Sequence, residues 1–272
     1  MKTLIIGAKG MLGQDLCKVF PDSIKWDKEE LDITNESLVL EKISQFNPDL
    51  VINSAGYTDV DGAETNKEIC FKVNADATGF LAKACNKISA KLVHISTDYV
   101  FNGKNKYYKE NSLKDPLNQY GLSKAKGEKL LIQNHDKFYL VRTAGLFGKN
   151  GKNFIDTILR LAKEKDVLEI VNDQFSCLTY TLDLANAIKD LIGKPYGIYH
   201  ITNSEYCSWF DLAKETLRFK SQNAIINPIS YMQLDRPAKR PECAILLNTK
   251  LNPLRSWKDA LKAYLEEKQN EN

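Results

Sequence analysis

The feature that most constrains the fold is a regular alternation of short apolar runs and longer amphipathic segments over the first 145 residues. The apolar runs have strand length, and the segments between them space their apolar residues as helices do. Strands that alternate with helices form a parallel sheet with helices on both faces. We therefore predict an α/β fold, a Rossmann-type doubly wound parallel sheet. The predicted strands are residues 4–6, 23–27, 49–53, 92–96 and 139–142, and the predicted helices are residues 11–20, 36–46, 67–87 and 119–134.

The alternation becomes less regular after Gly145, where we predict a smaller mixed α/β C-terminal substrate lobe. A late strand at residues 197–201 is expected to return to the main sheet. The predicted organisation is a cofactor domain of residues 1–150, joined by residues 180–203, and a substrate lobe of residues 151–179 and 204–272. The other elements expected after Gly145 are helices at 153–163, 181–192 and 257–267 and a strand at 167–171, with Pro228, Pro237, Pro241 and Pro253 breaking up the rest.

Composition excludes several classes of protein. Of the 272 residues, 43% are hydrophobic and 27% are charged, which is ordinary for a soluble enzyme. A net charge of +3 without a dense basic block argues against a nucleic-acid partner. The first apolar run is too short for a signal peptide and no stretch approaches a membrane helix, so we expect a cytoplasmic protein without a membrane partner. The six cysteines contain no Cys-x-x-Cys pair, and we predict neither a metal nor disulfides.

The most informative turn is the glycine-rich segment that follows the first predicted strand. Gly7, Gly10 and Gly13 are spaced as G-x-x-G-x-x-G and lead directly into the first predicted helix. Glycines let a pyrophosphate approach the backbone, and the helix N-terminus offers amide donors and a partial positive charge. This context favours a dinucleotide site over a turn without a ligand.

Other residues at strand ends extend the cofactor prediction. Asp27 ends the second predicted strand, where an acid can bind the adenosine ribose. Lys9 and Lys28 could instead receive a 2′-phosphate, although both are equally consistent with ordinary surface lysines, so we expect either NADPH or NADH. Asp32 and Ile33, slightly further along the chain, could flank the adenine. Small residues close the third predicted strand and would let the cofactor pass, namely Asn53, Ser54, Ala55 and Gly56.

A tyrosine and a lysine spaced by four residues suggest proton-transfer chemistry. Tyr120 and Lys124 share one face of a predicted helix, and the lysine cation is expected to lower the pKa of the phenol. Such pairs are frequent by chance on solvated helices. Thr97, at the end of the fourth predicted strand, adds a hydroxyl that can hold a substrate carbonyl beside the tyrosine. With a hydride donor, these groups make up a carbonyl reductase.

With these motifs, the chain resembles the dTDP-4-dehydrorhamnose reductase family of the extended short-chain dehydrogenase/reductase superfamily. The resemblance covers nearly the whole chain, and its most specific strings are Val60-Asp-Gly-Ala-Glu64 and Ser96-Thr-Asp-Tyr-Val-Phe101. It implies reduction of a 4-keto-6-deoxy sugar on dTDP with NADPH or NADH. The further matching segments are 7–13, 53–64, 73–76, 95–103, 120–128, 142–148, 153–154 and 173–174.

The resemblance also implies roles for individual residues. The catalytic residues would be Thr97, Tyr120 and Lys124. The cofactor would contact Gly7, Gly10, Met11, Leu12, Gly13, Asp27, Asp32, Ile33, Asn53, Ser54, Ala55, Tyr57, Asn74, Tyr120 and Lys124. The nucleotide sugar would contact Thr97, Asp98, Val100, Asn153, Phe154, Arg236 and Arg240.

The chain departs from the family pattern in two segments of the substrate lobe. Residues 175–179 lack the usual glycine and proline, and residues 240–246 lack an Asn-Ser pair, so the sugar pocket is expected to differ. Some family members hold Mg²⁺ at a dimer contact through acidic residues. Asp15 lies near one such place, but an acid in the first helix is usually solvated, and we predict no metal. The protein is expected to be a monomer or a homodimer.

Three interpretations of function remain open from the sequence. The first is a nucleotide-sugar 4-ketoreductase, and the second is a related epimerase. The third is a non-catalytic, cofactor-binding regulatory subunit like that of methionine adenosyltransferase. Tyr99 after Thr97-Asp98 disfavours a dehydratase, which carries an acid there. A basic turn formed by Arg236, Lys239 and Arg240 either binds the substrate diphosphate or is simply solvated.

Overall fold

The computed structural model describes residues 1–269, and its centre is a six-stranded sheet. Every neighbouring pair of strands is parallel, which confirms the predicted doubly wound fold. The late strand does return to this sheet, where it lies at one edge. The strand order is β2 (Ile24–Trp26), β1 (Thr3–Ile6), β3 (Leu50–Asn53), β4 (Lys91–Thr97), β6 (Phe138–Thr143) and β11 (Gly197–His200).

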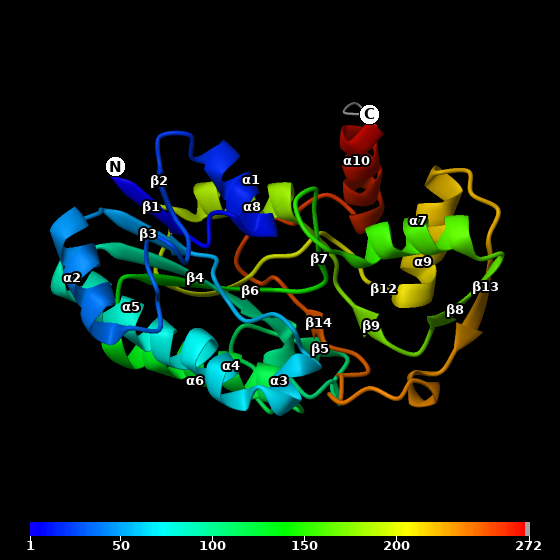
Figure 1. The fold of residues 1–272 in the computed structure, drawn as a ribbon, viewed down its shortest axis with the longest axis horizontal. Coiled ribbons are helices and arrows are strands. Elements are labelled where there is room, and N and C mark those ends of the chain that lie inside the picture. The colour runs from blue at the N-terminus through cyan, green and yellow to red at the C-terminus, as the bar shows by residue number, and fades with distance from the viewer. Residues whose placement is uncertain (270–272) are drawn as a thin grey trace.

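Helices cover both faces of the sheet (Figure 1). Side chains along a strand point alternately to the two faces. Accordingly, Ile5 packs in the cluster that contains Leu16, whereas its neighbours Leu4 and Ile6 pack in the cluster that contains Leu81. No helix among residues 1–269 is both long and apolar enough to cross a membrane. The first face carries α1 (Met11–Val19) and α8 (Thr181–Leu191), and the second carries α2 (Glu36–Phe46), α5 (Ala77–Lys87) and α6 (Gln119–Asn134).

The helix predicted over residues 67–87 is interrupted. It consists of α4 (Lys67–Phe71), a π-helical turn η1 (Lys72–Asp76) and α5. A π-turn shifts the residues beyond it around the helix axis, and the period of the apolar residues alone did not reveal it. Asn74, one of the predicted cofactor residues, lies inside this turn and is buried. A short helix, α3 (Gly62–Thr65), precedes it.

A second lobe follows β7 (Leu146–Phe147) and carries the C-terminal helix (Figure 1). Its strands β8 and β13 pair in parallel. Pro228 lies within β13, although we expected this proline to interrupt structure. A two-stranded sheet has only edge strands, where proline is tolerated because its nitrogen needs no partner. The elements of this lobe are α7 (Phe154–Glu164), β8 (Val167–Val171), α9 (Trp209–Phe219), β13 (Ile225–Ile229) and α10 (Trp257–Gln269).

Short strand pairs connect segments that are distant in sequence. One pair is antiparallel and two are parallel. We propose that the domain boundaries fall where the sequence suggests, with residues 180–203 belonging to the cofactor domain. The pairs are β7 with β10 (Thr179–Tyr180), β9 (Phe175–Ser176) with β12 (Cys207–Ser208), and β5 (Tyr107–Tyr108) with β14 (Ile245–Leu246).

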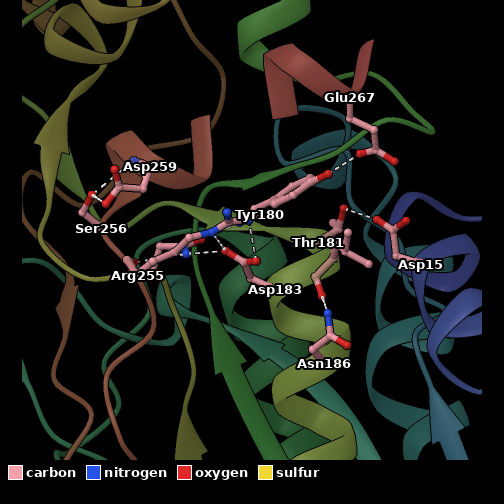
Figure 2. A network of polar contacts seen from close by, with 11 residues as sticks. Asp15, Tyr180, Thr181, Asp183, Asn186, Arg255, Ser256, Asp259 and Glu267 are labelled. Carbon is pink, nitrogen blue, oxygen red and sulfur yellow. Dashed lines mark hydrogen bonds and ion pairs between the residues drawn. The ribbon is translucent and has the colours of Figure 1, made fainter. Parts of the chain in front are cut away.

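A polar network fastens α10 to the first lobe (Figure 2). Asp15 in α1 accepts hydrogen bonds from the Thr181 hydroxyl at 2.6 Å and from Lys18 Nζ at 2.8 Å. Nearby, the Tyr180 hydroxyl donates to Glu267 of α10. Asp15 is only 2% exposed, so the expectation of a solvated acid was wrong. Its carboxylate instead holds two helices of the first lobe together.

Candidate active site

The first cavity lies at the point where the order of strands along the sheet reverses, between β1 and β3. The chain leaves β1 toward β2 on one side and later returns to β3 on the other, and such switch points are where α/β sheets bind ligands. The cavity has a volume of about 330 Å³. Its lining includes five of the predicted cofactor residues, Gly7, Asp27, Asp32, Ile33 and Ala55.

The glycine loop is shaped for a close backbone approach. A Cβ at Gly13 would lie 2.0 Å from the carbonyl oxygen of Gly7, so only glycine allows α1 to begin this near β1. Asp27 braces the loop, because its carboxylate accepts hydrogen bonds from the backbone N–H groups of Lys9 and Lys28, both at 2.9 Å. Lys9 Nζ pairs with Glu29 at 2.8 Å. The loop and its cavity therefore fit the pyrophosphate and adenosine of a dinucleotide.

The remaining predicted cofactor residues lie at the start of α1 or in the loops beside it. At the start of α1, Leu12 packs in the core and can offer a ligand only its backbone, whereas the side chain of Met11 lies beside Gly151. The residues after β3 and in η1 form hydrogen bonds that hold these loops in place. Asn53 accepts from Ala55 N at 3.1 Å, the Ser54 hydroxyl donates to Ile6 O at 2.8 Å, and Asn74 accepts from Tyr57 N at 2.8 Å.

We predict that Gly10→Val abolishes measurable NADPH binding without unfolding the protein. A Cβ at Gly10 would meet only Gly7 O, at 3.3 Å, a tight contact that a shift of a few tenths of an ångström relieves, but the valine side chain would occupy the approach of the pyrophosphate. Binding is measured as the rise in melting temperature on adding NADPH. Gly13→Ala serves as the contrasting variant, since it should destabilise the fold itself. A normal NADPH-induced shift in Gly10→Val would contradict the assignment.

The three predicted catalytic residues converge at the carboxyl end of β4. The Thr97 hydroxyl lies near enough to the Tyr120 phenol to lower its pKa, and it donates a hydrogen bond to Asp98 at 3.0 Å. The Tyr120 ring also contacts the Tyr99 ring edge-on, with centroids 5.6 Å apart. This approach depends on Gly121, where a Cβ would lie 2.2 Å from the carbonyl oxygen of Tyr99. The N-terminal turn of α6 thereby carries Tyr120 up to the segment that follows β4, η2 (Asp98–Val100).

The protonation of the pair differs from our expectation. We expected Lys124 to lower the pKa of Tyr120, but the surrounding protein displaces water and raises that pKa, while the hydrogen bond with Thr97 opposes the rise only in part. Tyr120 nevertheless retains partial exposure. Burial also lowers the pKa of Lys124 to about 8, and its ammonium donates to Ile95 O at 2.6 Å. At neutral pH the phenol therefore holds its proton and the lysine remains mostly charged.

A second cavity, of about 340 Å³, adjoins these residues on the side of the second lobe. Four of the predicted substrate residues line it, namely Asp98, Asn153, Phe154 and Arg240. Val100 does not, because it is fully buried beside Phe101, and its side chain cannot touch a ligand; this prediction was wrong for the side chain. Asn153 caps α7 and accepts from Asp156 N at 2.9 Å, so part of its carboxamide already serves the fold.

The basic turn formed by Arg236, Lys239 and Arg240 is paired with Asp61, an acid that lies far from it in the sequence. Arg240 forms two hydrogen bonds with Asp61, at 2.7 and 2.9 Å, and Arg236 lies 3.5 Å from the same carboxylate. These ion pairs neutralise much of the positive charge of Arg236 and Arg240, which we predicted to bind the substrate diphosphate. Lys152 also lines the cavity, is exposed, and has no ion-pair or hydrogen-bond partner among residues 1–269. Nothing in the residues around Lys152 distinguishes it from the many other lysines of the chain.

Asp98 is an unusual carboxylate within this cavity. It is 4% exposed, and burial raises its pKa to about 6, despite hydrogen bonds from the Thr97 hydroxyl at 3.0 Å and the Ser176 hydroxyl at 3.3 Å. The folded protein thus holds this proton more tightly than the unfolded chain. The contribution of Asp98 to stability is present below pH 4 and is lost as the pH rises through about 6.

Accordingly, Asp98→Asn should be more stable than the unmodified protein at pH 8. The expected gain in the free energy of unfolding is up to about 3 kcal/mol, because a neutral amide avoids the burial of charge. The difference in the free energy of unfolding between the two proteins should become smaller toward pH 4, where both side chains are neutral in the folded protein. Denaturant unfolding at several pH values measures this difference. A difference that does not change between pH 4 and 8 would contradict the raised pKa.

Comparison with known proteins agrees with this geometry. The family model described as the RmlD substrate binding domain matches residues 1–270. The chain is 38% identical to a dTDP-4-dehydrorhamnose reductase of Aggregatibacter actinomycetemcomitans, over 96% of this chain and 97% of that protein.

Solved structures give the same result. One, of a dTDP-4-dehydrorhamnose reductase from Clostridium acetobutylicum, has a TM-score of 0.96 and 37% identity and covers 99% of this chain and all of that one. Another, of a dTDP-4-dehydrorhamnose reductase from Bacillus anthracis in complex with NADP, has a TM-score of 0.95 and 36% identity, with 98% and 100% coverage. The match of the family model along nearly the entire length, together with these relatives, shows that the chain belongs to the dTDP-4-dehydrorhamnose reductase family.

Proposed function

We propose that the protein reduces the 4-keto group of a nucleotide-activated deoxysugar, converting dTDP-4-dehydro-L-rhamnose to dTDP-L-rhamnose with NADPH or NADH. The observation that carries this proposal is the approach of the Tyr120 phenol to Thr97 at the end of β4, beside a cavity lined by Asp98. A hydroxyl pair of this kind can hold a carbonyl oxygen and protonate it. Membership of the reductase family supports the same chemistry.

In this proposal, NADPH or NADH supplies a hydride to C4 of the sugar when bound. The chain's own residues deliver the proton and fix the geometry. Thr97 orients the carbonyl oxygen, and Tyr120, whose raised pKa keeps it protonated, donates its proton to that oxygen as negative charge develops. Lys124, largely charged at neutral pH, then stabilises the phenolate left on Tyr120 until it regains a proton from water.

For the substrate, we propose that the sugar lies against Asp98 and Ser176 and that the nucleotide extends toward Phe154 and Trp209, all of which line the cavity. Lys152 is the better candidate for the diphosphate, since Arg236 and Arg240 are already paired with Asp61. For the cofactor, Asp27 and Lys28 both line the adenosine cavity, so one offers an acceptor to a free ribose hydroxyl and the other a charge to a 2′-phosphate. We therefore propose that both dinucleotides are accepted.

Steady-state oxidation of NADPH and NADH tests the proposal. The unmodified protein should oxidise either dinucleotide with dTDP-4-dehydro-L-rhamnose and more slowly with other 4-keto nucleotide sugars. Binding of the dinucleotide without turnover of any sugar would support a regulatory subunit instead.

A further inference from the structure

One buried side chain in the substrate cavity lacks a partner. Gln174 lies between β8 and β9 and is 5% exposed. Its amide nitrogen Nε2 is buried and has no hydrogen-bond partner among residues 1–269. A buried donor without an acceptor destabilises a folded protein, because the group has lost its hydrogen bonds to water and gained none in return. Gln174 lines the same cavity as Asp98 and Ser176, so a ligand there could supply the missing acceptor.

The position of Gln174 relative to the catalytic residues indicates which part of a ligand it would meet. Ser176 donates to Asp98, which in turn accepts from Thr97, so Ser176 marks the catalytic end of the cavity. Gln174 precedes Ser176 by two residues, which is about 7 Å in an extended chain. This separation is comparable to the width of a sugar ring.

The segment around Gln174 is held from both sides. The Asp173 carboxylate accepts from the Ser230 hydroxyl at 2.6 Å and from Tyr231 N at 2.8 Å. Phe175 N donates to Glu242 O at 2.8 Å. Since both neighbours are fixed, the backbone cannot easily turn the glutamine toward solvent. A ligand in the cavity can therefore bring the missing acceptor to Gln174.

We propose that Gln174 is a substrate-specificity residue whose carboxamide donates a hydrogen bond to an oxygen on the sugar ring of the nucleotide sugar. This inference rests on the proposed function. A neutral amide suits a neutral hydroxyl or ring oxygen, and the sugar is the part of the substrate that lies one ring width from Thr97 when its C4 carbonyl is at the catalytic hydroxyls.

Gln174→Met tests this inference, because methionine has a similar length but no donor. We expect KM for dTDP-4-dehydro-L-rhamnose to rise about 10-fold, NADPH affinity to stay unchanged, and the melting temperature of the ligand-free protein to stay equal or rise. The last result distinguishes a binding residue from a structural one, since loss of a structural hydrogen bond would lower the melting temperature. An unchanged KM, or a lowered melting temperature, would overturn the assignment.

Gln222→Met is a matched control. Gln222 also has a buried polar atom without a partner, but it lines a separate cleft beside Lys220 and Leu265. Its replacement should leave KM unchanged. Inhibition by dTDP, which lacks the sugar, gives a second readout. Its inhibition constant should be the same for Gln174→Met and the unmodified protein, and a parallel increase would contradict contact with the sugar.

Activity of the unmodified protein distinguishes failure of the proposed function from failure of the assignment of Gln174. If it fails to reduce the sugar at all, the proposed function fails and the inference falls with it. If it reduces the sugar and Gln174→Met has the same KM, only the assignment of Gln174 fails.

Discussion

Tyr120→Phe is expected to lower kcat by about 10²–10⁴-fold, the usual contribution of a positioned proton donor. The phenol lies beside Thr97, and its raised pKa keeps the proton in place at neutral pH. Phenylalanine preserves the ring and its edge-on contact with Tyr99. The measurement is steady-state turnover of dTDP-4-dehydro-L-rhamnose with NADPH.

Two controls accompany this variant. NADPH affinity should be nearly unchanged, because the glycine loop and the adenosine cavity are untouched. Tyr99→Phe removes a hydroxyl from the neighbouring ring and should cost less than 10-fold in kcat, since that hydroxyl is assigned no proton transfer. Turnover of Tyr120→Phe at the rate of the unmodified protein would show that another group donates the proton.

The largest expected loss of stability comes from Arg142→Met. Arg142 and Glu128 are 1% and 0% exposed and form a two-bond ion pair, at 2.8 and 2.9 Å, between β6 and α6. Burial alone would raise the pKa of Glu128, but the hydrogen bonds and charges of Arg142 and Lys114 hold it at about 2. Removing the arginine leaves a buried carboxylate that has lost its main partner, at a cost of about 3–5 kcal/mol in the free energy of unfolding.

The double variant Arg142→Met with Glu128→Gln separates the charge from the packing. It should recover a large part of the loss, because the unpaired charge is the main source of the cost. Denaturant unfolding of the single and double variants measures both values. A single variant within 1 kcal/mol of the unmodified protein, or a double variant less stable than the single one, would contradict this account.

The fold, and the set of candidate catalytic residues, could be predicted because both rest on local patterns. Strand-length apolar runs and helical spacing are properties of neighbouring residues, so they gave the sheet and its covering helices. Tyr120 and Lys124 became candidates through their spacing on one helix, and Thr97 through its position at a strand end. None of these predictions required knowledge of which distant segments meet.

Other features depend on contacts between distant segments. The pairing of Arg240 with Asp61 joins residues 179 apart in the sequence, and no local pattern around either residue predicts it. The raised pKa of Tyr120 and the missing partner of Gln174 follow from burial in the folded chain. One missed element had a local signal: α9 begins with a capping box, in which Ser208 and Asp211 bond each other's backbone.

In the proposed reaction, hydride reaches C4 of the sugar while the protein supplies the proton. Turnover of dTDP-4-dehydro-L-rhamnose with NADPH that carries deuterium at both C4 positions of its nicotinamide tests both halves of this reaction. We expect each dTDP-L-rhamnose molecule to carry a single deuterium, at C4 of the sugar, and each to be matched by the oxidation of one NADPH. A product without deuterium, or conversion of the sugar without net oxidation of NADPH as an epimerase would give, would contradict the account.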